Sequence, residues 1–297
     1  MALKASTFLL VLVGLALVAG CAGRQATSTA ISEAEGHADL GATHMAAGKF
    51  ADAADEYRLA IQIDSGNPDY YLSLGTAYDK QGLLPEAIEA HRRAVEVTPK
   101  SDARYRPHLL ALAKLLYENQ IYADAISVYK AALELAPEDF DVIETLGLLY
   151  LKVEIYAPAA ELYEKAVAQR PRDAQLRYWL ATAYSKMGAT EKAIVNMDEA
   201  VKLEPGNPDL YWLLGDLYNR AQRYDEAIGA AQSLLAIKPG SAGAHCVWAE
   251  ALARQGRTAD ARAEFQKAVE ANDPAWSPYA AREIEDIDRG EKGEAGN

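Results

Sequence analysis

A repeat of small residues every 34 positions constrains the fold of this 297-residue chain more than any other feature of its sequence. Seven alanines recur with five steps of 34 residues and one of 38, and mostly small residues recur twelve positions before and seven positions after them. A fixed period of this length is typical of solenoids, in which each copy buries its apolar face only against its neighbours. The alanines are Ala53, Ala87, Ala125, Ala159, Ala193, Ala227 and Ala261.

The residues around these alanines resemble the tetratricopeptide repeat, which has small residues at positions 8, 20 and 27, large residues at 4, 11 and 24, and proline at 32. The large residues here include Tyr71, Tyr78, Tyr129, Tyr150, Tyr163, Tyr184, Tyr218 and Phe265, and the prolines are Pro99, Pro137, Pro171, Pro205 and Pro239. The resemblance implies an all-α fold, a right-handed superhelical solenoid of seven helix–turn–helix repeats over residues 34–273. The repeats begin near residues 34, 68, 106, 140, 174, 208 and 242.

Residues typical of helix ends recur in phase with the repeat. Glycine is expected as the left-handed residue after the first helix of four repeats, at Gly48, Gly82, Gly188 and Gly256. Side chains that cap helix N-termini precede five repeats, at Asn67, Asp139, Asp173, Asn207 and Ser241. Four additional residues around 101–105 predict a longer loop between the second and third repeats.

A different pattern follows the last repeat. Residues 274–289 predict a capping helix, with Ala280, Ala281, Ile284 and Ile287 facing inward and charged residues on the other face. A solenoid needs such a polar outer surface on its terminal element. Residues 290–297 are predicted to be a disordered tail.

The N-terminus is predicted to be a targeting signal. Lys4 precedes a purely apolar run of 13 residues, which is too short to span a membrane but is typical of a secretory signal. The run ends at Val18-Ala19-Gly20-Cys21, which resembles the lipobox of bacterial lipoproteins. Residues 1–20 are therefore predicted to be a signal peptide, Cys21 the acylated (palmitate-bearing) lipid anchor, and 21–33 a flexible tether. Ala22 after the cysteine implies, by the same resemblance, the periplasmic face of the bacterial outer membrane.

The composition excludes several classes of function. The chain has 30 Lys and Arg against 43 Asp and Glu, a net charge of −13, which argues against nucleic acid as the partner. No nucleophile elbow, phosphate-binding loop or metal-binding histidine pair is present in the sequence. We therefore predict no catalytic residue, metal or cofactor, and hence a protein that is not an enzyme. Cys246 is interpreted as a buried small side chain rather than a reactive thiol.

By the geometry of the family, the first helices of the repeats line a concave groove. Apolar residues at inward positions form a strip that core packing does not require, and we predict that it binds an apolar peptide or helix, with Tyr178 and Trp212 as anchors. In the alternative, the superhelix closes tightly or the capping helix folds back, and the strip is buried. The strip consists of Leu72, Leu110, Tyr117, Leu148, Leu151, Tyr178 and Trp212.

A possible basic ladder lies at the end of the first helix in five repeats, at Lys80, Lys152, Lys186, Arg220 and Arg254. These cations pair either with carboxylates of a partner or with the negative end of their own helix dipole.

The favoured function is a non-enzymatic adaptor that is anchored to the outer membrane by its lipid and holds another envelope protein or peptide through the concave groove. The layout is similar to the pilotin lipoproteins of type IV pili and secretion systems, and it is shared with other envelope adaptors of export machinery. The alternative is a glycan- or peptidoglycan-associated module that recruits cell-wall enzymes, since tyrosine and tryptophan rings stack on sugars.

Overall fold

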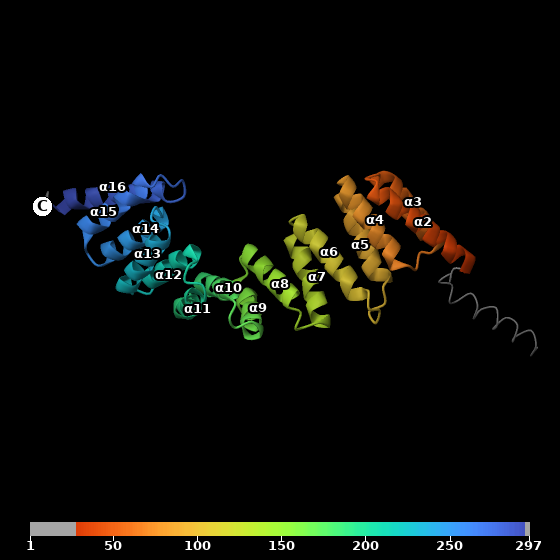
Figure 1. Cartoon of the computed structure of the whole chain (residues 1–297), viewed down its shortest axis with the longest axis horizontal. Helices are drawn as coiled ribbons and strands as arrows, with labels where there is room; N and C mark the ends of the chain where they lie inside the picture. Colours follow the sequence, from red (N-terminus) through yellow and green to blue (C-terminus); the bar gives the residue numbers. More distant parts are fainter. Residues whose placement is uncertain (1–27, 295–297) are drawn as a thin grey trace, which may run out of the picture. The chain divides into compact units, whose positions relative to one another are not determined.

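A computed structural model describes residues 28–294, and its elements are helices that follow one another as antiparallel pairs (Figure 1). The described part contains fifteen helices and no strand. It divides into two compact units, one ending at Pro137 and the other beginning at Glu138. The predicted all-α solenoid fold is confirmed, whereas the predicted signal peptide and Cys21 lie outside the described residues.

The first unit holds three helix pairs, in each of which the second helix packs back along the first. Its helices are α2 (Ser28–Ala46), α3 (Phe50–Ile63), α4 (Pro68–Gln81), α5 (Leu84–Val97), α6 (Tyr105–Glu118) and α7 (Tyr122–Leu135).

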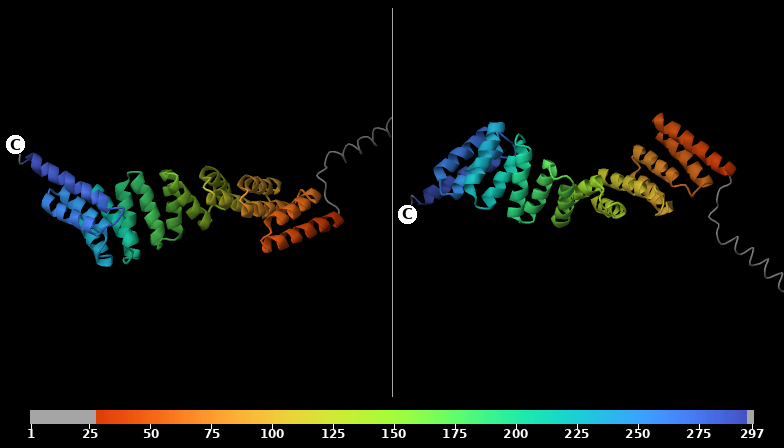
Figure 2. Two further views of the ribbon diagram at one scale, coloured as in Figure 1. Left: turned by 90° about the horizontal axis from the view of Figure 1, so that it is seen from above. Right: turned by 60° about the horizontal axis from the view of Figure 1, so that its bottom comes forward.

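The second unit holds four helix pairs and a terminal helix, and each pair packs against the next. Figure 2 shows the pairs of this unit in two further views. Its helices are α8 (Phe140–Lys152), α9 (Tyr156–Gln169), α10 (Ala174–Lys186), α11 (Thr190–Leu203), α12 (Pro208–Arg220), α13 (Tyr224–Ile237), α14 (Ala242–Arg254), α15 (Thr258–Glu270) and α16 (Ser277–Glu294).

The predicted helix ends are confirmed. Each of the five predicted N-cap side chains accepts a hydrogen bond from a backbone N–H in the first turn of its helix. The four predicted glycines have φ between +72° and +77°. Three repeats place a residue with a side chain at the equivalent left-handed position, at Gln120, Glu154 and Gln222, with φ of +61° to +62°. The left-handed turn is therefore a property of all seven repeats, whether or not glycine supplies it.

The small and large positions of the repeat interlock within each pair. A Cβ atom added to Gly41 would lie 2.8 Å from the Tyr57 ring, and one added to Gly147 would lie 2.9 Å from the Tyr163 ring. Tyr163 is fully buried. The aromatic residue of the second helix therefore packs directly on the backbone of the first, and glycine is required where that contact is closest.

The four additional residues between the second and third repeats form an ordered loop. Arg104 forms ion pairs with Asp69 at 2.7 Å and with Asp102 at 2.8 Å. Behind it the buried His108 contacts the Thr98 hydroxyl at 2.8 Å and the Asp69 carboxylate at 3.2 Å. These contacts fix the longer connection to the start of α4.

Hydrogen bonds also join consecutive pairs in the second unit. The Tyr218 hydroxyl on α12 donates to Asp198 on α11 at 2.6 Å, and the Tyr184 hydroxyl on α10 donates to Glu164 on α9. The tyrosines occupy the same position of successive repeats, so the sequence period repeats a polar link as well as an apolar contact.

The terminal helix α16 covers the end of the second unit. Ala280 is fully buried against α14 and α15, and Ile284 and Ile287 pack on the same cluster, whereas Ala281, also predicted to face inward, is half-buried and outside it. The helix continues to Glu294, whereas we predicted disorder from residue 290. Ile287 is the last residue of α16 that packs on the cluster, and the helical backbone continues beyond this contact.

The first helix also differs from the prediction. The structure begins α2 at Ser28, whereas the flexible tether was predicted to extend to residue 33. Ala34 is fully buried against Ala60 and Tyr70, and this packing holds α2 in place near its N-terminus. The helix also includes the residues from Ser28 onward that precede this contact. Within the residues that the structure describes, no helix combines the length and apolar character needed to cross a bilayer.

Candidate functional site

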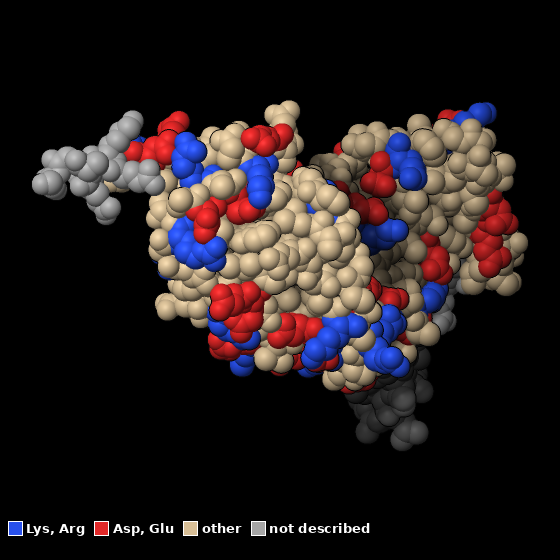
Figure 3. All heavy atoms as spheres, turned by 60° about the vertical axis from the view of Figure 1, so that its left-hand side comes forward, with Lys and Arg blue, Asp and Glu red and all other residues tan. Residues whose placement is uncertain are grey.

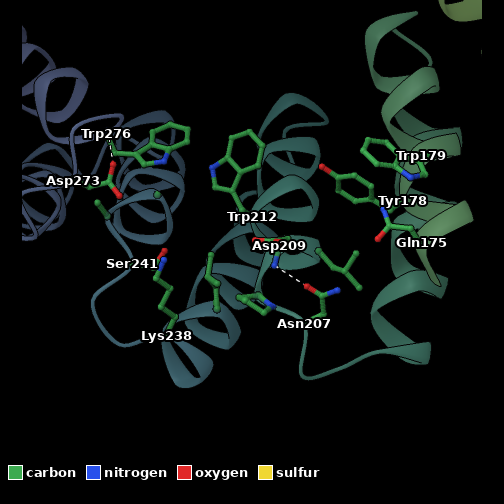
Figure 4. Close-up of a pocket in the computed structure, with 15 residues that line it drawn as sticks. Gln175, Tyr178, Trp179, Asn207, Asp209, Trp212, Lys238, Ser241, Asp273 and Trp276 are labelled. Atoms are coloured by element: carbon green, nitrogen blue, oxygen red, sulfur yellow. Dashed lines mark hydrogen bonds between the residues drawn. The ribbon is translucent and has the colours of Figure 1, made fainter. Parts of the chain in front are cut away.

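The second unit contains a cavity of about 520 Å³ at the first turns of three successive first helices (Figure 4). Tyr178 comes from α10, Trp212 from α12 and Gly243 from α14, while Trp276 comes from the segment that leads into α16. The 34-residue period places Tyr178 and Trp212 at the same position of consecutive repeats. The site therefore combines residues of the repeat with a residue that lies outside it.

The two tryptophans form one wall of this cavity. Their ring centroids lie 5.3 Å apart, with the planes inclined by 50°. A Cβ atom at Gly243 would lie 3.1 Å from the Trp212 ring and 3.2 Å from the Trp276 ring, so the absence of a side chain there allows both rings to approach α14. The Nε1 atom of Trp212 is buried and has no hydrogen-bond partner among the described residues. This indole N–H is a buried donor without an acceptor, which costs free energy.

Tyr178 lies opposite the tryptophans. Its ring packs edge-on against Trp179 with centroids 4.9 Å apart, and its hydroxyl points toward Trp212 (Figure 4). Burial raises the pKa of the Tyr178 hydroxyl above its ordinary value. The hydroxyl is therefore neutral at physiological pH.

A second cavity, of about 690 Å³, lies between α12, α14 and α16. Asp216, Glu250 and Glu283 contribute carboxylates to it, and Arg220 and Arg254 contribute guanidinium groups. Glu250 accepts a hydrogen bond from the Tyr279 hydroxyl at 2.7 Å. Burial raises the pKa of both Asp216 and Glu250. The lining is therefore polar, in contrast to the aromatic first cavity.

The structure brings together only part of the predicted strip. Tyr178 and Trp212 line one cavity, while Leu148 and Leu151 lie half-buried on α8 and do not line it. The other members of the strip, Leu72, Leu110 and Tyr117, are half-buried in the first unit, on α4 and α6.

Sequence reasoning missed the contributions of the terminal segment to both cavities. Trp276 and Tyr279 lie outside the phase of the repeat, so the period gives no sign that they face the groove. Their aromatic character in a segment that is otherwise charged is the one signal for them. The segment before α16 thus covers part of the groove, while Tyr178 and Trp212 remain half-buried beside the cavity.

The five basic residues of the predicted ladder are all exposed. Arg220 donates to the Ser185 hydroxyl at 2.6 Å and to the Ser185 carbonyl at 3.0 Å, near the end of α10. This cation therefore contacts the carboxyl end of the neighbouring first helix, where the helix dipole favours positive charge. Arg220 thus contacts a neighbouring helix end, whereas the interpretation based on the dipole concerned the end of its own helix.

Cys246 is fully buried in the cluster beneath α16, and burial raises the pKa of its thiol to about 12. Its sulfur is therefore a protonated, unreactive core atom at neutral pH. Within the described residues, no group of three or more His, Cys, Asp or Glu side chains is placed to hold a metal ion. On the face drawn in Figure 3, acidic and basic side chains lie beside one another around an area without charged residues.

Comparison with known proteins agrees with this architecture. Models of the tetratricopeptide repeat match residues 41–82, 72–140, 162–195, 181–242 and 219–281. The chain is 30% identical over 114 residues to tetratricopeptide repeat protein 14 of Mus musculus, an alignment that covers 37% of this chain and 15% of the mouse protein.

Solved structures with this fold include MamA, at 26% identity and a TM-score of 0.52, which covers 54% of this chain and 94% of MamA. YrrB, described as a TPR protein with an unusual peptide-binding site, has 18% identity and a TM-score of 0.52 over 64% of this chain and 96% of YrrB. A tetratricopeptide repeat protein from Parabacteroides merdae has 18% identity and a TM-score of 0.50 over 86% of this chain and 99% of that protein.

Proposed function

Because this chain belongs to the tetratricopeptide-repeat family, whose members serve as protein–protein interaction scaffolds, we propose that it is an adaptor that holds a peptide segment of another envelope protein. The proposed binding site is the aromatic groove, defined as the cavity between Tyr178, Trp212 and Trp276. The observation that carries this proposal is the set of three aromatic rings, from Tyr178, Trp212 and Trp276, that line one cavity of about 520 Å³. Large aromatic side chains around a pocket are the residues that dominate protein interfaces.

The adaptor is further proposed to be anchored to the periplasmic face of the bacterial outer membrane through Cys21. The support for the anchor is the apolar run followed by Val18-Ala19-Gly20-Cys21. Several acyl chains on one cysteine hold a protein firmly, since each buried methylene contributes about 0.8 kcal/mol. The machine that the adaptor assists is proposed to be a pilus, secretion or export assembly, by the similarity in layout to pilotin lipoproteins.

The test is affinity capture from envelope extracts after mild cross-linking, with wild type, Trp212→Ala and Val195→Ala compared at equal protein levels. Val195 is a matched control because it is 62% exposed on α11 and does not line either cavity. We expect a protein that is recovered with wild type and Val195→Ala and is lost with Trp212→Ala. Equal recovery with all three proteins would contradict the groove as the binding site.

A glycan-binding module is a second candidate, favoured by the same three aromatic rings. It is distinguished by adding defined peptidoglycan fragments to the purified chain and following the intrinsic tryptophan fluorescence. Saturable quenching by the fragments, abolished by Trp212→Ala, would favour the glycan, whereas an adaptor leaves the fluorescence unchanged.

A further inference from the structure

The aromatic groove and the polar cavity open along one face of α12. Trp212 lines the first and Asp216, one helical turn further on, lines the second. Residues four apart on a helix share a face, and four residues rise about 6 Å along its axis. The terminal segment borders both cavities as well, through Trp276 and Tyr279. A single stretch of bound chain can therefore contact both.

The aromatic groove defines one part of such a ligand. Its rings, from Tyr178, Trp212 and Trp276, favour a large apolar side chain. A peptide supplies such a side chain.

The polar cavity defines the other part by its charge. The guanidinium of Arg220 directs its hydrogen bonds to Ser185 and lies 3.8 Å from the Asp216 carboxylate. Glu250 accepts a hydrogen bond from the Tyr279 hydroxyl and also contacts the Asn219 side chain, and neither partner is a cation. Glu283 adds a third carboxylate, while Arg254 is the remaining cation of the lining. Asp216 is already paired with Arg220, but the three carboxylates of the lining outnumber its two guanidinium groups, so the cavity favours the arrival of a further cation.

Resting on the scaffold function proposed above, we infer that the partner presents an extended segment with a large apolar side chain two residues from a Lys or Arg. The apolar side chain enters the aromatic groove, and the basic side chain reaches Asp216 and Glu250 in the polar cavity. The spacing follows from geometry, because an extended chain advances about 3.3 Å per residue, so two residues match the turn of α12 that separates Trp212 from Asp216.

The experiment titrates the full chain, purified in detergent, against fluorescein-labelled peptides and follows fluorescence anisotropy. The central probe contains Phe-Ser-Arg between Gly-Ser flanks, and a second probe contains the reverse order Arg-Ser-Phe. Matched probes replace Arg with Glu, replace Phe with Ala, or place Arg directly after Phe. We expect the better of the two central probes to bind at least tenfold more tightly than each of its matched probes.

Two variants assign the effect to its cavity. Asp216→Asn combined with Glu250→Gln is expected to abolish the preference for Arg over Glu while retaining binding of the Phe side chain. Trp212→Ala is expected to weaken binding of the central probe at least tenfold. Glu161→Gln combined with Glu270→Gln is the charge-matched control, since both glutamates are exposed and outside the two cavities. A melting curve of each variant shows that it is folded.

The outcomes separate this inference from the proposed function. If the Arg and Glu probes bind equally well to the folded wild-type chain, the ligand does not need a basic residue and that part of the inference is wrong. Equal binding of the shifted-Arg probe would overturn the two-residue spacing. If no probe binds although the envelope capture still depends on Trp212, the adaptor function stands and this ligand is wrong. If the Asp216→Asn and Glu250→Gln double variant still prefers Arg over Glu, the basic side chain binds outside the polar cavity. That result also overturns the inference.

Discussion

The indole ring of Trp276, just before the terminal helix, packs against that of Trp212 on α12, with centroids 5.3 Å apart. Trp212 was expected to be free of the forces that hold the repeats together, because its position in the repeat faces the groove. Its contact with the terminal segment means that it also helps to hold α16 in place. The proposed binding site and the contact that holds the terminal segment thus share a side chain.

We predict that the two tryptophans are energetically coupled. A double-mutant cycle of Trp212→Ala and Trp276→Ala, measured by urea unfolding, should give a coupling free energy of about 0.5–1.5 kcal/mol, as for other aromatic pairs. The matched cycle of Val195→Ala with Trp276→Ala should give none. A coupling free energy near zero for the tryptophan pair would show that the ring contact is not formed in solution.

Two glycines of α2 should respond in opposite directions to alanine. Gly41→Ala places a methyl group 2.8 Å from the Tyr57 ring, and we expect a loss of about 1–3 kcal/mol from overpacking. Gly36→Ala meets nothing within 4 Å and should gain about 0.5–1 kcal/mol from helix propensity. Thermal melting followed by circular dichroism checks both, and a change of the same sign in the two variants would contradict the packing.

The left-handed residue after each first helix gives a second opposed pair. Glu154 has φ of +61°, and Glu154→Gly should stabilise the chain by up to about 1 kcal/mol because glycine adopts this conformation without strain. Gly82→Ala introduces the same strain where no atom lies within 4 Å, so it should cost about 1–2 kcal/mol. Chemical denaturation of the two variants measures both, and a stabilising effect of Gly82→Ala would refute the backbone assignment.

The stability contributed by Glu250 should depend on pH. Burial raises the pKa of this carboxyl above its ordinary value of 4.5, and Asp216 and Glu283 act in the same direction, while the hydrogen bond from Tyr279 opposes them. The folded chain therefore holds the proton more tightly than the unfolded chain, so ionisation of Glu250 lowers stability as pH rises.

Glu250→Gln should accordingly melt at a higher temperature than wild type at about pH 7, and the difference should close as the pH falls toward about 4. The exposed Glu161→Gln serves as the control and should show no comparable trend. Melting curves of Glu250→Gln and wild type across this pH range test the prediction. If the difference in melting temperature widens on acidification, the assigned direction of the pKa shift is wrong.

Cys21→Ser should release the protein from the membrane fraction, because the lipid is proposed to be its only anchor. Fractionation after a salt wash measures this, with the helix content followed by circular dichroism as a control for folding. A serine variant that still sediments with membranes would contradict the lipid anchor.

The repeat made most of the fold predictable. Caps such as Asn67 and Asp173 and turns such as Gly188 lie at fixed positions, and each acts through backbone contacts within a few residues. The side chain of Glu154 gives no signal for its left-handed conformation, and only its place in the period, 34 residues before Gly188, indicates it. Local signals therefore fix most of the helix ends, and the period supplies the rest.

The site was predictable only in part. The period places Tyr178 and Trp212 on equivalent faces, which is why sequence reasoning found them. Trp276 and Tyr279 reach the groove because the chain reverses after α15 and α16 packs back on the last repeat. The spacing of Ala280, Ile284 and Ile287 predicts that α16 packs on the last repeat, but it does not indicate that Trp276 and Tyr279 line the cavities.

The position of the terminal segment also bears on how this gene tolerates truncation. A nonsense or frameshift mutation after Ala271 would leave every repeat encoded, yet it would remove Trp276, Tyr279 and Glu283, which form one side of both cavities. Such an allele would still encode the full number of repeats, but its protein would lack the side chains that the terminal segment contributes to the two cavities. The last 26 residues, although they lie outside the repeats, should therefore be as intolerant of loss in a genetic screen as the repeats themselves.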